Sequence, residues 1–291
     1  MSASRAAWWF IAPALLVIGV FFLLPAAASF LLSLTDFDLY ALADPLNRRW
    51  VGFDNYIELL QRPLFWQAMG NTLYFVLVGV PLSILVSLSA AVLLQDAAAR
   101  GTAFFRTALF APVVTTVVAV AVIWRYLFHT RYGWINYALD GIGIAPVDWL
   151  GDPQWAMPTL ILFAVWKNFG YNMIILLAGL QAIPTDLYEA ARIDGANRWQ
   201  QFRHITLPGL QPMLLMVAIL TTAGYFQLFA EPYVITEGGP VQSTLSVLYL
   251  MFEEGFKWWN LGMASAVAFT LFAMMLTVTL LLSRLAGRAR P

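Results

Sequence analysis

The polar side chains that interrupt the longest apolar stretches are the first candidates for chemistry. Asn168 and Asn172 are spaced i and i+4, which places both amides on one face of a helix. An amide both donates and accepts hydrogen bonds, so this pair is suited to a ligand that carries hydroxyl groups. Thr221, Tyr225 and Leu228 share one face in a later stretch. The alternative for these residues is structural, because polar side chains also join helices by hydrogen bonds and aromatic rings also pack in cores.

Lys167 lies directly before the asparagine pair, within the same apolar stretch. An ammonium group in hydrocarbon is costly, so it should pair with an acid, face a water-filled route or extend to the membrane surface. Glu231, at the end of the stretch that carries Tyr225, is the candidate acid. We expect a pair with Glu231 or a position on a route.

The sequence indicates neither an enzyme nor a metal site. It contains no cysteine and only two histidines, His129 and His204, and it has none of the motifs H-E-x-x-H, G-x-S-x-G or G-x-x-x-x-G-K-[ST]. Sixteen basic residues balance sixteen acidic ones, so no overall field attracts nucleic acid. We therefore expect no catalytic residues, no cofactor bound by this chain and no nucleic-acid partner.

The composition places these residues in a membrane. Of the 291 residues, 61% are hydrophobic and 11% charged, against about 25% charged in soluble domains. A bilayer core about 30 Å thick needs roughly 20 apolar residues per helix, and lipid offers an open backbone no hydrogen-bond partners. We predict an all-α integral membrane protein with a single transmembrane domain over residues 1–291. Its six transmembrane helices are expected at approximately 8–34, 69–94, 105–125, 155–180, 208–231 and 260–283.

The basic residues predict the orientation of these helices. With the N-terminus in the cytoplasm, Lys167 lies inside a span and six basic residues face outward, namely Arg48, Arg49, Arg62, Arg125, Arg131 and Lys257. The larger set then lies in the cytoplasm, made up of Arg5, Arg100, Arg106, Arg192, Arg198, Arg203, Arg284, Arg288 and Arg290. Both termini are therefore expected in the cytoplasm. The first apolar stretch is too long for the core of a signal peptide, so we expect it to remain as a span.

The loop at 184–208 has the most specific pattern in the chain. We predict a short helix, a turn and a second short helix, with signals in the order Pro184 at the entry, Thr185 or Asp186 as cap, Gly195 as helix stop, Asn197 as second start and Pro208 as loop end. Small residues at Ala190 and Ala191 allow a partner surface to approach closely. The alternative is an ordinary polar loop that packs on the bundle.

The spacing of this loop resembles that of a known family. Glu189-Ala190-Ala191, three residues, Gly195, nine residues and Ile205-x-Leu207-Pro208 resemble the E-A-A loop in membrane subunits of bacterial ABC importers, the binding-protein-dependent permeases. Other short segments are similar to the maltose and glycerol-phosphate branch, namely Leu180-Gln181-Ala182-Ile183-Pro184, Gly52-Phe53-Asp54-Asn55-Tyr56, Asn71-Thr72, Gly238-Gly239-Pro240 with Ser243-Thr244, and Gly262-Met263-Ala264-Ser265-Ala266.

The resemblance implies a type I ABC importer permease fold in the bacterial inner membrane. It also implies the partners: a second homologous permease subunit, two ATPase subunits that bind ATP and Mg, an extracytoplasmic solute-binding protein and membrane lipid. The loop at 184–208 would be the coupling element that contacts the ATPase, through Glu189, Ala190, Ala191, Asp194, Gly195, Ile205, Leu207 and Pro208.

The same resemblance implies a carbohydrate substrate and a set of contact positions. Alignment through the shared segments places the sugar contacts of the maltose branch at Asn168, Phe169, Asn172, Thr221, Tyr225 and Leu228. Leu228 departs from the polar residue expected there, so the sequence leaves the sugar or polyol open. The rival interpretation, an ATP-independent carrier or channel, does not explain the spacing from Glu189 to Pro208.

Overall fold

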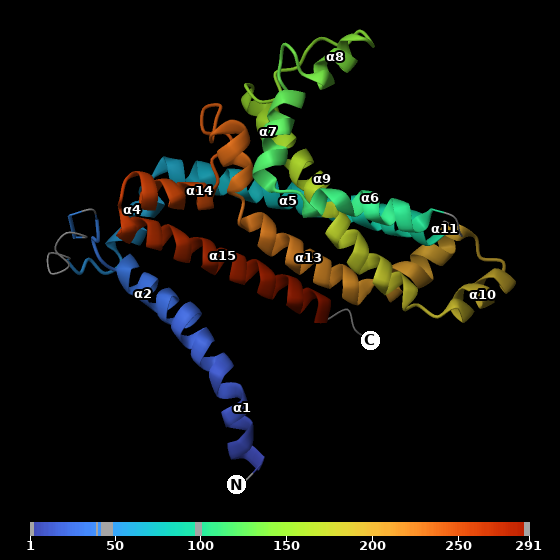
Figure 1. Ribbon diagram of the computed structural model, residues 1–291, viewed down its shortest axis with the longest axis horizontal. Helices are drawn as coiled ribbons and strands as arrows, with labels where there is room; N and C mark the ends of the chain where they lie inside the picture. Colours follow the sequence, from blue (N-terminus) through green and yellow to red (C-terminus); the bar gives the residue numbers. More distant parts are fainter. Residues whose placement is uncertain (1–2, 39, 42–48, 97–100, 288–291) are drawn as a thin grey trace. The chain divides into compact units, whose positions relative to one another are not determined.

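The computed structural model describes residues 3–38, 40–41, 49–96 and 101–287 (Figure 1). Arg48, Arg100, Arg288 and Arg290, which the orientation argument used, lie outside these residues. In the described part the backbone is mainly helical, and one isolated antiparallel bridge joins Thr35 to Trp50. Two compact units are present, residues 1–66 with 250–273 and residues 67–249 with 274–291. Each unit is described by itself below.

Four helical segments in the described residues are long and apolar enough to cross a membrane. They are Trp8–Ser33, Pro63–Gln95, Pro153–Gln181 and Leu261–Arg284. Two bent helix pairs raise the number of spans to as many as six if each pair crosses as one unit, Thr102–Val114 with Val117–Leu127 and Arg198–Gly209 with Gln211–Phe226. The count of six spans and their predicted bounds stay a prediction.

The third predicted span is not one straight helix. Helix α6 (Thr102–Val114) and helix α7 (Val117–Leu127) meet at 97°. Thr115 and Thr116 between them have extended backbones. Pro112 lies in the last turn of α6 and has no N–H group to donate, which weakens the helix just before the break. The apolar composition of this segment predicts a span but does not predict the bend.

The first unit consists of helices near the two ends of the sequence. Helix α1 (Ala3–Ile18), π-helix η1 (Gly19–Leu23) and helix α2 (Leu24–Ser33) run into one another. Helix α4 (Asp54–Gln61), π-helix η5 (Glu253–Lys257) and the first part of helix α15 (Leu261–Gly287) complete the unit.

Two of the family-like segments meet in this unit. The amide of Asn55 donates to the backbone oxygens of Ser33 and Thr35, both at 2.8 Å. The Tyr56 hydroxyl lies 2.7 Å from that of Ser33. Gly262, at the start of α15, donates its N–H to the Phe37 oxygen at 2.9 Å. The segments around residues 52–56 and 262–266 therefore join the end of the first apolar helix to the start of the last.

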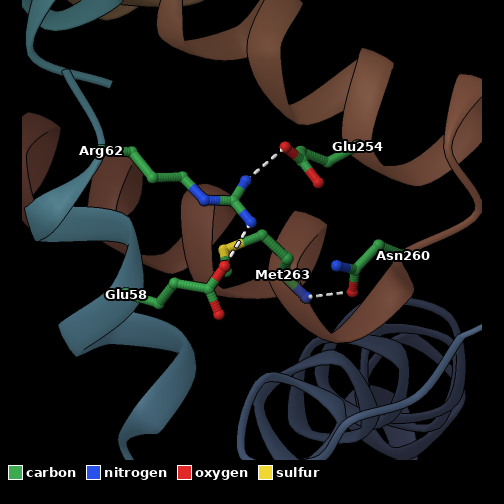
Figure 2. A network of polar contacts seen from close by, with 5 residues as sticks. All are labelled: Glu58, Arg62, Glu254, Asn260 and Met263. Atoms are coloured by element: carbon green, nitrogen blue, oxygen red, sulfur yellow. Dashed lines mark hydrogen bonds and ion pairs between the residues drawn. The ribbon is translucent and has the colours of Figure 1, made fainter. Parts of the chain in front are cut away.

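A charged cluster holds α4 to η5 in the same unit (Figure 2). Arg62 donates to Glu58 at 2.5 Å and to Glu254 at 2.7 Å. Burial lowers the pKa of Arg62, but the hydrogen bond to Glu58 and the charges of Glu254 and Glu58 outweigh that effect, so the pKa lies above its ordinary value. Nearby, Asn260 accepts a hydrogen bond from the Met263 N–H at 3.1 Å, which begins α15.

The second unit contains a core of buried apolar side chains. Helices α5 (Pro63–Asp96), α9 (Pro153–Gln181) and α13 (Gln211–Phe226) supply its buried side chains, and α6 lies along α9 (Figure 1). The core residues are Ala91, Met173, Leu176, Leu177, Leu180, Ile183, Leu210 and Val217. Shorter elements are helix α8 (Trp134–Asp140), π-helix η4 (Pro232–Thr236) and helix α14 (Val247–Phe252), which runs into the first unit.

Another pair of family-like segments meets in this second unit. The Asn71 amide donates to the backbone oxygens of Gln242 and Leu245, both at 2.9 Å. The Thr72 hydroxyl accepts the Val247 N–H at 3.0 Å. Thr244 donates to the Gly239 oxygen at 2.8 Å within the same loop. Asn71-Thr72 therefore fixes the loop that contains Gly238-Gly239-Pro240 onto helix α5.

Candidate functional site

The loop at 184–208 begins with helix α10 (Thr185–Ile193). Pro184 precedes this helix, and neither Thr185 nor Asp186 caps it with a side-chain hydrogen bond. That part of the prediction is wrong, because Thr185 and Asp186 already lie in the first turn. Asp186 still carries a negative charge close to the helix N-terminus, where the helix dipole favours it.

The predicted turn after α10 is confirmed. Gly195 has φ +78°, and the Ala196 N–H reaches back to the Ala191 oxygen at 2.8 Å. This closes the helix in the manner of a glycine C-terminal cap. Asn197 then begins the next helix through a reciprocal pair of bonds, with its side chain accepting the Gln200 N–H at 2.9 Å and its own N–H bonded to the Gln200 side chain at 2.8 Å.

The second helix of the loop is longer than predicted. Helix α11 (Arg198–Gln201), π-helix η3 (Phe202–Thr206) and helix α12 (Leu207–Gly209) follow one another directly, and the bend of 66° onto α13 comes at Leu210. Pro208 therefore lies inside helical backbone, and the loop ends at the bend at Leu210 instead. Pro208 directly follows η3 and has no N–H group to donate.

The two helices of the loop are braced from within. The Tyr188 hydroxyl lies 2.9 Å from the hydroxyl of Thr206, and Tyr188 and Ile205 pack against the buried core of the second unit. Sequence reasoning did not single out Tyr188 or Thr206. The amphipathic spacing of α10 is the signal that points Tyr188 inward.

The outer side of the same loop is open. Leu187, Ile193 and Trp199 are 51%, 87% and 67% exposed. A side chain added at Gly195 would meet nothing within 4 Å. The predicted contact residues divide accordingly: Glu189, Ala190, Asp194, Gly195, Leu207 and Pro208 are exposed, and Ala191 and Ile205 are partly buried. The loop thus presents apolar and charged side chains of both signs, among them Glu189 and Arg192, on a braced two-helix frame.

The predicted polar positions of the spans occupy the interior of the second unit. The Asn172 amide donates to the Thr221 hydroxyl at 2.9 Å and to the Ser83 hydroxyl at 3.3 Å. Asn172 and Thr221 are 3% and 7% exposed. Asn168 instead donates to the Ala164 oxygen of its own helix. Asn172 and Thr221 therefore join α5, α9 and α13, and a ligand contact by any of these side chains stays a prediction.

Tyr225 occupies a slot between helices. Its ring lies 5.0 Å from that of Phe75, and a side chain at Gly79 would come within 2.8 Å of it. The ring is buried, and its hydroxyl lies near the side chains of Ser83 and Asn168 but forms no hydrogen bond of standard geometry in the described part of the chain. Phe169 and Leu228 are buried as well.

Lys167 does not form the expected close ion pair. Its ammonium donates to the Val113 oxygen at 3.0 Å, and no bridge to Glu231 within 4.0 Å is present, although the structure describes both residues. The lysine is 6% exposed. It therefore binds the backbone of α6 at the end of that helix.

Apolar helices of membrane-spanning length and a braced, exposed two-helix loop define a polytopic membrane protein with a surface for a partner. Residues 63–291 match the family described as "Binding-protein-dependent transport system inner membrane component". The chain belongs to this family, and the resemblance inferred from the loop is confirmed. It is a multi-pass component of the inner membrane that serves transport.

Two relatives cover almost the whole chain. A lactose transport system permease protein from Rhizobium radiobacter is 37% identical over 279 residues, which make up 94% of this chain and 91% of the relative. A trehalose/maltose transport system permease protein from Thermococcus litoralis is 34% identical over 290 residues, 99% of this chain and 95% of the relative.

A solved structure establishes the fold. The chain matches a bacterial ABC transporter involved in the import of the acidic polysaccharide alginate, with a TM-score of 0.82 and 24% identity over 99% of this chain and 96% of the other. The predicted all-α permease fold is therefore confirmed. The location of both termini in the cytoplasm stays a prediction.

Proposed function

We propose that this chain is one of two membrane-spanning subunits of an ATP-driven importer for a sugar, which an extracytoplasmic solute-binding protein delivers. The substrate is a mono-, di- or oligosaccharide. ATP and Mg are bound by two ATPase subunits, and this chain itself binds no cofactor. The second permease subunit is homologous to this one and completes the pathway.

The names of relatives support a carbohydrate substrate. Permeases for lactose, trehalose/maltose and arabinooligosaccharides are 37%, 34% and 32% identical over more than nine-tenths of this chain. Hydrogen-bonding side chains stand at four of the predicted contact positions and suit a ligand rich in hydroxyl groups, namely Asn168, Asn172, Thr221 and Tyr225. Rings such as Tyr225 suit stacking on a pyranose.

The observation that carries the proposal is the braced loop at 184–208. A short helix is marginal by itself, but α10 is tied to η3 through Tyr188 and Thr206. A force applied to the exposed side at Leu187 or Ala190 would therefore reach η3 through this side-chain contact, and α13 across the bend at Leu210. Motion of the ATPase pair would rotate the spans and expose the pathway alternately to either side.

Purification from the native membrane in mild detergent tests the assembly. We expect a second six-span permease and a soluble ATPase to copurify, with ATP hydrolysis that binding protein and one sugar stimulate together. After reconstitution into liposomes, uptake should require ATP. Purification of this chain alone, with solute movement in the absence of ATP, would refute the proposal and favour the carrier.

Substitutions in the loop test its coupling role. We expect Gly195→Asp and Ala190→Asp each to lower uptake at least tenfold while membrane insertion stays normal, because a buried partner contact would receive an unpaired charge. Gly143→Asp is the matched control, since Gly143 also has φ +78° with open space at its Cβ but lies in another loop. Wild-type uptake by both loop variants would contradict the role.

A further inference from the structure

The break between α6 and α7 leaves backbone oxygens that need partners. The last carbonyl groups of a helix have no partner within that helix, and in a membrane such groups are satisfied internally. The Pro112 oxygen accepts hydrogen bonds from the Thr115 hydroxyl at 2.6 Å and from the Thr115 N–H at 3.3 Å. The next oxygen along the chain, that of Val113, receives the ammonium of Lys167.

The Lys167 contact is built into the packing of α9 on α6. A cation at a helix C-terminus is favoured by the helix dipole. Gly170, one turn beyond Lys167 on α9, allows the two backbones to touch, because a Cβ there would lie 2.5 Å from the Leu109 oxygen and 3.1 Å from the Phe110 Cα. Lys167 and Gly170 therefore hold the end of α6 at two successive turns of α9.

A second acidic group lies next to the elements that pack around this contact. Glu231 directly precedes η4, and η4 contacts both α7 and α9, the helix that carries Lys167. Lys167 and Glu231 form no bridge within 4.0 Å. One hydrogen bond of the ammonium is formed, to Val113, and its three donors allow more. Lys167 is thus bonded to α6 on one side of the break, and η4 links its helix α9 to α7 on the other side.

We propose that Lys167 is a positioning residue that changes partner when the transporter changes state. It caps Val113 in the state described here and pairs with the Glu231 carboxylate in the other, so the angle between α6 and α7 is linked to alternating access. This inference rests on the proposed function. Because the Lys167 ammonium binds one of two acceptors at a time, the bend between α6 and α7 has two discrete arrangements.

Four variants in the complete reconstituted transporter test the exchange. We expect Lys167→Met and Glu231→Gln each to lower ATP-dependent uptake at least tenfold, with assembly and basal ATP hydrolysis within twofold of wild type. The double variant should be no worse than either single one, and Lys167→Arg should keep at least a third of the uptake. Lys257→Met is the matched control, because it removes the chain's other lysine from an exposed pair with Glu253.

Three results of this assay would overturn the inference. Wild-type uptake in Glu231→Gln, or additive losses in the double variant, would make Lys167 a static cap. If Lys167→Met raised only the sugar concentration for half-maximal uptake, the result would indicate that Lys167 contacts the sugar. If the reconstituted wild-type complex showed no ATP-dependent uptake, both the proposed function and the exchange would be overturned. The wild-type control therefore distinguishes this outcome from the other two.

A spectroscopic readout reports the bend directly. The chain has no cysteine, so Phe105→Cys on α6 and Ile123→Cys on α7 can be spin-labelled selectively, and both native side chains are 55% exposed. We expect the distance between the labels to differ between nucleotide-free and nucleotide-trapped complexes, and Lys167→Met to abolish the difference. An unchanged distance in the otherwise wild-type background would overturn the inference.

Discussion

Gly262→Ala is the sharpest test of how the first unit is held together. A Cβ at this position would lie 2.2 Å from the Thr35 oxygen and 3.2 Å from the Phe37 nitrogen. Both are backbone atoms, so no side chain can rotate away. Because carbon and oxygen normally approach to about 3.3 Å, the start of α15 must move by roughly 1 Å. The bond from Gly262 to the Phe37 oxygen would then be lost.

The magnitude follows from these two effects. Overpacking of this kind costs about 1–3 kcal/mol, and loss of one backbone hydrogen bond adds about 1 kcal/mol. At 2–4 °C per kcal/mol for a protein of roughly this size, we expect Tm to fall by on the order of 5–10 °C. The assay is loss of the monodisperse peak after heating in detergent, measured with a fluorescent tag.

The control is Gly70→Ala, because Gly70 lies within helix α5 and a Cβ there meets nothing within 4 Å. Alanine is the better helix former by roughly 1 kcal/mol, so this variant should melt at or slightly above the wild-type temperature. A Gly262→Ala protein that melts like the control would refute the backbone contact as the reason for glycine.

Two further substitutions test polar groups. Arg62→Met leaves Glu254, whose side chain is 12% exposed, without its ion pair, so we expect a loss of about 1–3 kcal/mol, seen as a lower Tm; an unchanged Tm would show that water replaces the arginine. Tyr225→Phe removes a buried hydroxyl that has no partner in the described residues, so Tm should hold or rise while sugar uptake falls. Tyr56→Phe is the control, because it breaks the 2.7 Å contact with the Ser33 hydroxyl and should lower Tm. Normal uptake by Tyr225→Phe would show that the Tyr225 hydroxyl does not contact the sugar.

Local rules predict the turn and the start of the second helix in the loop at 184–208. Gly195 stops α10 and Asn197 starts the next helix because each acts on backbone groups within a few residues. The apolar segments are predictable for a similar reason, since membrane thickness sets their length. The same rules predict the end of the loop at Pro208, whereas the bend lies at Leu210, because Pro208 continues the helical backbone that follows η3.

Contacts between distant residues lie beyond such rules. At the bend between α6 and α7, the Val113 oxygen is bonded by Lys167, 54 residues away in the sequence. Nothing near residue 113 in the sequence announces that partner. The family-like segments at 52–56 and 262–266 were recognisable, but their role became clear only when Asn55 was found bonded to the carbonyl groups that end the first apolar helix.

The scaffold and the pathway compete for the same side chains. An amide bonded to two hydroxyl groups, as in Asn172, has little donor capacity left for a ligand. The Tyr225 hydroxyl lies near Ser83 and Asn168 without a hydrogen bond of standard geometry, and the Asn168 amide is bonded to a carbonyl of its own helix. Substrate recognition by this chain is therefore expected to depend more on Tyr225 and Asn168 than on Asn172. A change of sugar between relatives would then leave the bonds of Asn172 in place, because losing them would separate α5, α9 and α13.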